Sequence, residues 1–314
     1  MTVLVTGANG FVGTPLCKKL RQNGYSVRGA VRAPWHSSSL DDIEIDSISA
    51  ATNWASALKD VTQVVHLAAR VHVMHDKSVD PLSEFRCVNV EGTGALARQA
   101  AAAGVGRFIF ISSIKVNGEQ TEVGRPFTPG DLPAPEDAYG ISKLEAEQLL
   151  RKIARDTGME VVIIRPPLVY GPGVKANFSS MMRCLARGLP LPLAAIDHNR
   201  RSLVALDNLV DLILTCLNHP AAANQTFLVS DGEDLSTVQL LKRMGAAMNN
   251  PTRLFYLPPA LLKLVAFSLN KPAIHQRLCG SLQVDIAQTR HVLDWTPPVS
   301  VDEGLRRAAE GFCP

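Results

Sequence analysis

The chain has 314 residues, of which 46% are hydrophobic and 5% are aromatic, and its formal net charge is +3 from 32 basic and 29 acidic residues. This length fits one large domain, or a domain with a smaller lobe. No run of Lys and Arg exceeds two residues, which argues against nucleic acid as a partner. No apolar run reaches the roughly 18 residues that a membrane span needs, and no charged leader with an apolar core is present. We therefore expect a cytoplasmic protein.

The cysteines and histidines give no sign of a metal site. The six cysteines are scattered, without a CxxC pair: Cys17, Cys87, Cys184, Cys216, Cys279 and Cys313. In a chain this long we expect them to be reduced rather than paired. His66, His72 and His75 lack a partnering cysteine or an HExxH pattern, so we expect packed or surface roles for them and no metal.

Strand-like and helix-like segments alternate over the first two-thirds of the chain. Strands are predicted at residues 3–5, 26–31, 63–68, 107–112 and 160–165, and helices at residues 14–23, 82–103 and 138–157. This alternation predicts an α/β fold, a Rossmann-type doubly wound parallel sheet, in a dinucleotide-binding domain over residues 1–166. Prolines and glycines become frequent beyond that point. Residues 167–314 are predicted to form mainly a smaller C-terminal substrate-binding lobe, with some segments returning to the first domain.

One stretch near the C-terminus has no evident role in such a fold. Residues 261–267 form a short apolar run that contains Lys263. We expect an amphipathic helix packed on the protein rather than a contact with a membrane surface. More broadly, residues 255–280 could cover the active site or meet a partner.

A glycine loop follows the first strand and opens the first helix. Gly7 permits a tight turn, Gly10 lets the backbone approach a pyrophosphate, and Gly13 allows the helix to pack closely on the strand. The helix N-terminus then presents free N–H groups and a positive dipole to phosphate. The position of the loop at the first strand–helix junction predicts a dinucleotide site.

The end of the second strand bears on the choice of cofactor. NAD enzymes usually carry Asp or Glu there to accept hydrogen bonds from the ribose hydroxyls. This chain reads Ala30-Val31-Arg32 instead, and Arg32 could contact a 2′-phosphate. The cofactor is thus NAD(P), with NADP(H) slightly favoured over NAD(H). Asp46 is a candidate for the adenine contact.

Tyr139 and Lys143 form the candidate catalytic pair. They lie four residues apart at the start of a predicted helix, which places them on one face. A nearby ammonium is expected to lower the pKa of the tyrosine, so that Tyr139 can act as general acid or base. Ser112 and Ser113 end the strand before this helix, where strand ends face the ligand crevice. No GxSxG elbow supports a serine hydrolase instead.

Together these motifs resemble the extended short-chain dehydrogenase/reductase family, in its nucleotide-sugar epimerase, dehydratase and reductase branch. The motifs span most of the chain: the glycine loop, His66-Leu67-Ala68-Ala69, Asn89, Ser112-Ser113, the Tyr139/Lys143 pair and Arg165-Pro166-Pro167.

The resemblance implies roles for individual residues. It implies that the dinucleotide is bound by Gly7, Asn9, Gly10, Phe11, Val12, Gly13, Leu67, Ala68, Ala69, Asn89, Ser112, Tyr139, Lys143 and Pro166. Ser113 would be the catalytic serine and would hold the substrate oxygen. Asn177, Phe178 and Arg201 would hold the nucleotide diphosphate, with Arg277 as a weaker candidate for a second clamp. A homodimer is also implied.

Departures from the family narrow the expected chemistry. The 4,6-dehydratases carry Asp-Glu after the catalytic serine, where this chain has Ile114-Lys115. The best-known 4-epimerases carry tyrosine at the position of Asn117. We therefore expect reduction of a 4-keto group at C4 of a UDP-linked hexose, in the synthesis of surface-polysaccharide precursors. A UDP-hexose 4-epimerase is the alternative, and a non-catalytic dinucleotide-binding sensor is an alternative of another class.

Overall fold

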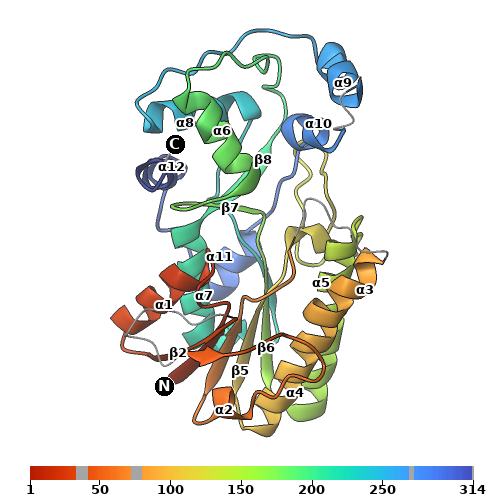
Figure 1. The fold of residues 1–314 in the computed structure, drawn as a ribbon, viewed down its shortest axis with the longest axis vertical. Helices are drawn as coiled ribbons and strands as arrows, with labels where there is room; N and C mark the ends of the chain where they lie inside the picture. The colour runs from red at the N-terminus through yellow and green to blue at the C-terminus, as the bar shows by residue number, and fades with distance from the viewer. Residues whose placement is uncertain (33–41, 72–79, 269–271, 313–314) are drawn as a thin grey trace.

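A seven-stranded parallel sheet forms the centre of the computed structural model, which describes residues 1–32, 42–71, 80–268 and 272–312. The strand order is β3-β2-β1-β4-β5-β6-β9 (Figure 1). The strands are β1 (Thr2–Thr6), β2 (Ser26–Val31), β3 (Ile43–Glu44), β4 (Gln63–His66), β5 (Arg107–Ile111), β6 (Glu160–Arg165) and β9 (Thr226–Leu228). The order reverses between β1 and β4, where an open α/β sheet binds its ligand. The predicted Rossmann-type fold is confirmed.

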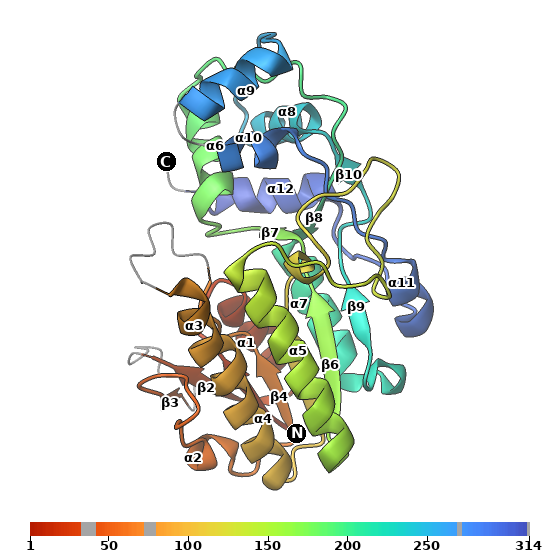
Figure 2. The same ribbon diagram turned by 90° about the vertical axis from the view of Figure 1, so that its right-hand side faces the viewer.

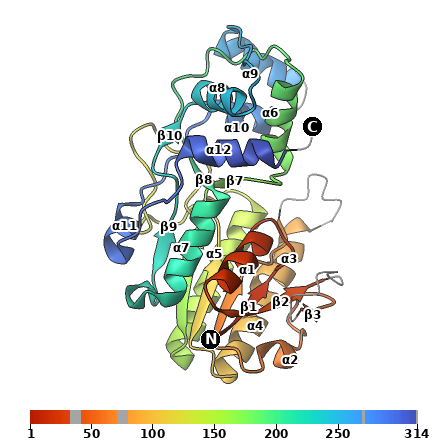
Figure 3. The ribbon, with the colours of Figure 1, turned by 90° about the vertical axis from the view of Figure 1, so that its left-hand side faces the viewer.

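Helices cover both faces of this sheet, so its strands are apolar on both sides. One face packs on α1 (Gly13–Gln22) and α7 (Leu206–Asn218), seen in front of the sheet in Figure 3. The other packs on α2 (Ala55–Leu58), α4 (Thr93–Ala102) and α5 (Ala138–Thr157), with the latter two in front in Figure 2. α7 and β9 follow residue 167 in the chain yet belong to these layers. The boundary at residue 166 stays a prediction.

Two predicted strands end early, at the carboxyl edge of the sheet. β4 stops at His66 rather than Ala68, and β5 stops at Ile111 rather than Ser112. The last β4–β5 partners are His66 and Phe110. Beyond them the chain leaves the sheet, so residues 67–70 follow the carboxyl end of β4 instead of continuing the ladder.

The helix predicted over residues 82–103 is one helical path with a defect. It consists of α3 (Pro81–Arg86), a π-helical segment (Cys87–Gly92) and α4. Asp80 caps the start by accepting a hydrogen bond from the Ser83 N–H at 3.1 Å. The π-helical segment shifts the register of the helix faces and carries Asn89, in keeping with the tendency of such segments to occur at functional sites.

A second, smaller unit sits above the carboxyl ends of the strands. Its sheet, ordered β10-β8-β7, contains β7 (Leu168–Tyr170), β8 (Arg201–Ala205) and β10 (Asp234–Leu235). Its helices are α6 (Ala176–Ala186), α8 (Thr237–Ala247), α9 (Pro259–Ser268), α10 (Pro272–Cys279) and α12 (Val301–Glu310). α11 (Ala287–Leu293) returns to lie beside β9. Among the helices of the described ranges, none has the length and apolarity to cross a membrane.

Candidate active site

The glycine loop is packed too tightly for side chains. Gly7 has φ +68°, a conformation that favours glycine, and its N–H donates to the Ala30 carbonyl at 3.0 Å. A Cβ atom on Gly13 would lie 2.1 Å from the Gly7 carbonyl oxygen. The first turn of α1 has no side-chain cap and no acidic residue. The backbone there is therefore suited to an anionic phosphate.

His66 links the ends of β1 and β4 to the start of α4. Its ring is buried and bridges two hydroxyls: Nδ1 lies 2.7 Å from Thr6 Oγ1 and Nε2 lies 2.9 Å from Thr93 Oγ1. Burial, together with Lys143, lowers the pKa of His66 to about 3, so the ring is neutral. The Ala68 N–H donates to Thr6 Oγ1 at 3.2 Å. The imidazole thus holds β4 and the start of residues 67–70 in place, which is the packed role expected for it; His72 and His75 lie outside the described residues.

Asn89 holds the segment after β4 by its backbone. Its Oδ1 accepts from the Arg70 N–H at 2.8 Å, and its Nδ2 donates to the Arg70 carbonyl at 3.0 Å. The same Nδ2 also lies 3.0 Å from Ser142 Oγ on α5. Asn89 is buried, and it connects the segment after β4 to the helix that carries Tyr139.

α5 begins and ends at the predicted residues because both ends are capped. Asp137 accepts from the Gly140 N–H at 2.7 Å, and Gly158 ends the helix in the left-handed conformation. Tyr139 and Lys143 lie on the same face, with Lys143 Nζ 5.9 Å from the Tyr139 ring centroid. The Ser113 hydroxyl forms a hydrogen bond with Tyr139. The structure thus brings Ser113, Tyr139 and Lys143 together.

The ionisation of this pair differs from the expectation. Burial and the nearby Asp137 raise the pKa of Tyr139 to about 12, although the hydrogen bond from Ser113 opposes this. Burial lowers the pKa of Lys143 to about 7, with Glu147 opposing. Lys143 Nζ donates to the Ile111 carbonyl at 2.8 Å. The predicted lowering of the tyrosine pKa is therefore wrong, because the desolvation of Tyr139 outweighs any effect of the ammonium.

A buried ion pair lies beneath the candidate catalytic residues. Glu147 accepts two hydrogen bonds from Arg165, from Nε at 2.9 Å and from Nη2 at 2.6 Å. It also accepts from the Ser112 hydroxyl at 2.6 Å. Arg165 Nη1 donates to Asn117 Oδ1 at 2.9 Å. Since the Ser112 hydroxyl is directed at Glu147, its expected contact with the nicotinamide would have to use other atoms of the residue.

Lys115 takes the place where the dehydratases carry a carboxylate. Its ammonium lies 2.7 Å from Glu119 and 2.5 Å from Asp137. Asp137 is the residue that caps α5 two positions before Tyr139. A cation paired in this way cannot serve as the general base for elimination of water.

In the second unit, Arg201 and Arg277 lie near each other. Burial and the charge of Arg277 lower the pKa of Arg201. Arg201 Nη1 donates to the Gly280 carbonyl at 3.1 Å. Asn177 is exposed, but the Phe178 ring is buried and stacks on Tyr170 with centroids 5.4 Å apart. Only the backbone of Phe178 is therefore free to take its expected part in holding the diphosphate.

The residues expected near the adenosine lie at the open edge of the sheet. Arg32 and Asp46 are both exposed, after β2 and β3 respectively. A carboxylate that the sequence interpretation missed lies beside β2. A Cβ atom on Gly29 would be 2.4 Å from Asp42 Oδ1 and 2.9 Å from Ala8 Cβ.

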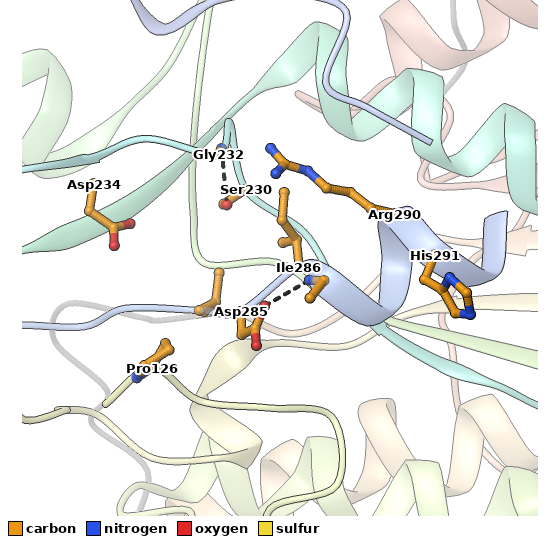
Figure 4. Close-up of a pocket in the computed structure, with 10 residues that line it drawn as sticks. Pro126, Ser230, Gly232, Asp234, Asp285, Ile286, Arg290 and His291 are labelled. Atoms are coloured by element: carbon orange, nitrogen blue, oxygen red, sulfur yellow. Dashed lines mark hydrogen bonds between the residues drawn. The ribbon is translucent and has the colours of Figure 1, made fainter. Parts of the chain in front are cut away.

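A separate pocket of about 560 Å³ opens beside β9 (Figure 4). Its lining is Pro126, Ser230, Gly232, Asp234, Val284, Asp285, Ile286, Ala287, Arg290 and His291. Ser113, Tyr139 and Lys143 do not contribute to it, so it is distinct from the catalytic group.

Sequence interpretation missed Glu147, Asp42 and the histidine bridge. A usable signal existed for Glu147 alone, since it lies one further turn along α5 from Lys143. Asp42 and Thr93 reach the site only through the fold of the whole domain, so no local sequence pattern could have predicted their positions. The five cysteines in the described part of the chain are free thiols, as expected.

Fold and site together define a short-chain dehydrogenase of the extended type. Residues 3–230 match the NAD dependent epimerase/dehydratase family, and the chain belongs to it.

Among its relatives, the chain is 51% identical to UDP-glucose 4-epimerase of Vibrio cholerae, over 99% of this chain and 95% of that one. It is 33% identical to dihydroflavonol 4-reductase of Zea mays, over 71% and 68%. Among solved structures, MoeE5 in complex with UDP-glucose and NAD is 27% identical, with a TM-score of 0.77 over 99% and 98% of the two chains.

Proposed function

We propose that this enzyme transfers hydride at C4 of a UDP-linked hexose, with Ser113, Tyr139 and Lys143 as its catalytic residues. The observation that carries the proposal is the convergence of Tyr139, Ser113 and Lys143 at the carboxyl end of β5, next to a glycine loop without room for side chains. When bound, the nicotinamide supplies or accepts the hydride.

The protein groups handle the proton and the substrate oxygen. Tyr139, whose pKa of about 12 keeps it protonated at neutral pH, donates a proton to the C4 oxygen as hydride arrives. In the reverse direction the Tyr139 phenolate takes the proton from the C4 hydroxyl as hydride leaves C4, which restores the phenol. Ser113 holds that oxygen. Lys143 supplies positive charge beneath the phenol. Arg201 and Arg277 grip the diphosphate, so binding energy far from C4 positions the sugar.

The form of the reaction that we favour is 4-epimerisation. It is supported by the 51% identity to a relative named UDP-glucose 4-epimerase. In that reaction C4 is oxidised, the 4-keto sugar rotates in the site, and hydride returns to the opposite face of C4. Arg201 and Arg277 keep hold of the diphosphate, so the 4-keto sugar can rotate within the site without being released.

Reduction of a 4-keto sugar is the second candidate, because Asn117 replaces the tyrosine of the best-known 4-epimerases. The Asn117 side chain is committed to Arg165 and to the Thr128 carbonyl. It is therefore a structural support rather than a group facing the sugar. This reading retains the proposed place in polysaccharide precursor synthesis, where a 4-ketone would be supplied by another enzyme.

For the cofactor we propose NAD(H) rather than NADP(H). Asp42 places a carboxylate against Gly29 and Ala8, at the side of β2 where the adenosine ribose is expected. A carboxylate accepts from ribose hydroxyls and repels a 2′-phosphate. Arg32 is the one feature that favours NADP(H), and it is exposed. We also retain the expected homodimer and the cytoplasmic location; the free thiols accord with a reducing compartment.

The test is to purify the protein, identify its bound cofactor by mass spectrometry, and supply UDP-sugars. An epimerase converts UDP-glucose or UDP-N-acetylglucosamine to the C4 epimer with no net change in the absorbance of the reduced nicotinamide. A reductase consumes reduced cofactor in proportion to added UDP-4-keto sugar. Binding of cofactor with neither reaction would support the non-catalytic sensor and overturn the proposal.

A further inference from the structure

α9 exposes the apolar side chains that were expected to pack on the protein. Leu261, Leu264 and Phe267 are 46%, 65% and 58% exposed. They recur at every third residue and so lie along one side of the helix. Leu262 packs against the hydrophobic core of the second unit and anchors the helix to it. The expectation of a packed amphipathic helix is thus wrong for the outer side of α9.

Two aromatic side chains just before α9 extend this exposed surface. Phe255 and Tyr256 are 47% and 69% exposed. The backbone of Phe255 is fixed, since its N–H donates to the Leu191 carbonyl at 3.0 Å and its carbonyl accepts from the Ala194 N–H at 3.2 Å. Tyrosine, with an apolar ring and a polar hydroxyl, is favoured at the boundary between lipid and water, and phenylalanine adds apolar area.

The charged residues of this part of the sequence have one sign. From residue 235 to residue 284 the sequence contains no Asp or Glu, whereas it contains Lys242, Arg243, Arg253, Lys263, Lys271 and Arg277. Arg253 and Lys263 are exposed, and neither forms an ion pair with a carboxylate in the described ranges. Because Arg253 and Lys263 flank the exposed aromatic and aliphatic residues, the surface combines apolar contact with positive charge.

This positive charge indicates which kind of partner could bind the exposed surface of α9. A second copy of the chain that used the same segment would offer Lys263 and Arg253 no carboxylate from residues 235–284, so their charges would face like charges without a partner. An anionic bilayer accepts both features at once: acyl chains accept the apolar side chains, and anionic headgroups attract the bases. α9 also lies at the end of the molecule farthest from the central sheet in all three ribbon views (Figures 1–3), so a flat surface can reach it.

We propose that α9, with Phe255 and Tyr256, docks the enzyme onto an anionic membrane surface, lying on it without spanning it. The docking surface is defined as Phe255, Tyr256, Leu261, Lys263, Leu264 and Phe267, with Arg253 beside it. It borders α10, which carries Arg277 of the proposed diphosphate clamp. The docking goes beyond the proposed reaction and does not depend on it.

The test is flotation of the intact protein with vesicles of phosphatidylcholine, with and without phosphatidylglycerol. We expect binding that needs the anionic lipid, with each basic residue at the surface contributing about fivefold in affinity. Added salt should reduce this contribution by screening the charges. Leu264→Glu should lower binding at least about tenfold, since it places a carboxylate in the apolar contact. Val123→Glu is the matched control, because Val123 is 59% exposed on another loop. Lys263→Glu should abolish the preference for anionic lipid, whereas Lys59→Glu should not.

Activity on a free UDP-sugar and the oligomeric state in solution are measured on the same variants. Leu264→Glu should retain both, which shows that it folds. Equal vesicle binding by wild type and Leu264→Glu, or no binding by wild type, would overturn the proposal. Dissociation of a wild-type oligomer in Leu264→Glu would overturn it too, because the surface would then be an interface between copies.

Discussion

Lys143 carries the charge next to Tyr139, the proposed catalytic tyrosine, and its burial controls whether that charge is present. Its folded-state pKa of about 7 lies below the usual 10.5, so the ammonium is present below neutral pH and is lost as pH rises through about 7. In the direction of ketone reduction, kcat/KM should therefore fall on the alkaline side with an apparent pKa near that value. A pH profile of kcat/KM measures this. A rate constant that stays level across neutral pH would show that Lys143 keeps its proton in the working enzyme.

Glu147 should matter for stability as well as for catalysis. Glu147→Gln leaves Arg165 buried without its counter-charge, and breaking a buried pair costs about 3–5 kcal/mol. We expect a large drop in the urea midpoint, and a fall in kcat with little change in KM, because the Ser112–Ser113 segment loses its anchor. Glu145→Gln is the control on the same helix, as Glu145 pairs with the half-exposed Arg86 at the surface. Equal effects of the two substitutions would contradict this role.

At the scale of elements, the glycine loop gives the sharpest prediction. Gly13→Ala would force a Cβ atom into the Gly7 carbonyl and move the start of α1, so NAD affinity should fall at least about tenfold. Gly106→Ala is the control, because its Cβ atom would find only the Thr62 carbonyl, 3.9 Å away. Calorimetric titration with NAD measures both. Unchanged NAD affinity in Gly13→Ala would show that the glycine loop does not bind the cofactor.

The elements also show what a sequence can predict. α5 is bounded as predicted because both ends have local signals: Asp137 caps the start, and Gly158 ends the helix. The π-helical segment was not predictable, because hydrophobic periodicity records a regular helix and gives no sign of an inserted residue. The outward side of α9 was missed for a similar reason, since an apolar run gives no information about which side the rest of the chain leaves uncovered.

The candidate site also has features that the sequence predicts and features that it does not. Tyr139, Lys143, Ser113 and the glycine loop are residue types in fixed spacings, and the structure brings them together. The ionisation of Tyr139 and Lys143 depends on burial, which spacing does not give. Asp42 reaches β2 across a chain connection, so no motif near β2 could reveal it.

At the scale of the whole molecule, the two units should bind the two ligands separately. Arg201→Met should weaken UDP binding about 10- to 100-fold, since a charged hydrogen bond to phosphate is lost, while NAD affinity stays unchanged. Arg290→Met is the control, because Arg290 is exposed at the separate pocket. Titrations with UDP and with NAD measure the effect. If both affinities fell together in Arg201→Met, the units would not act as separate binding parts.

Transfer of hydrogen from C4 tests the central claim most directly. UDP-hexose deuterated at C4 is mixed with enzyme in a single turnover, and the cofactor and the sugar are recovered for mass spectrometry. The account predicts deuterium on the reduced nicotinamide, and loss of this transfer in Tyr139→Phe with the cofactor still bound. Because hydride returns to C4 in epimerisation, the finished epimer should carry the deuterium at C4 again. A converted sugar whose C4 hydrogen comes from water, with no deuterium on the nicotinamide at any time in the turnover, would contradict hydride transfer at that carbon.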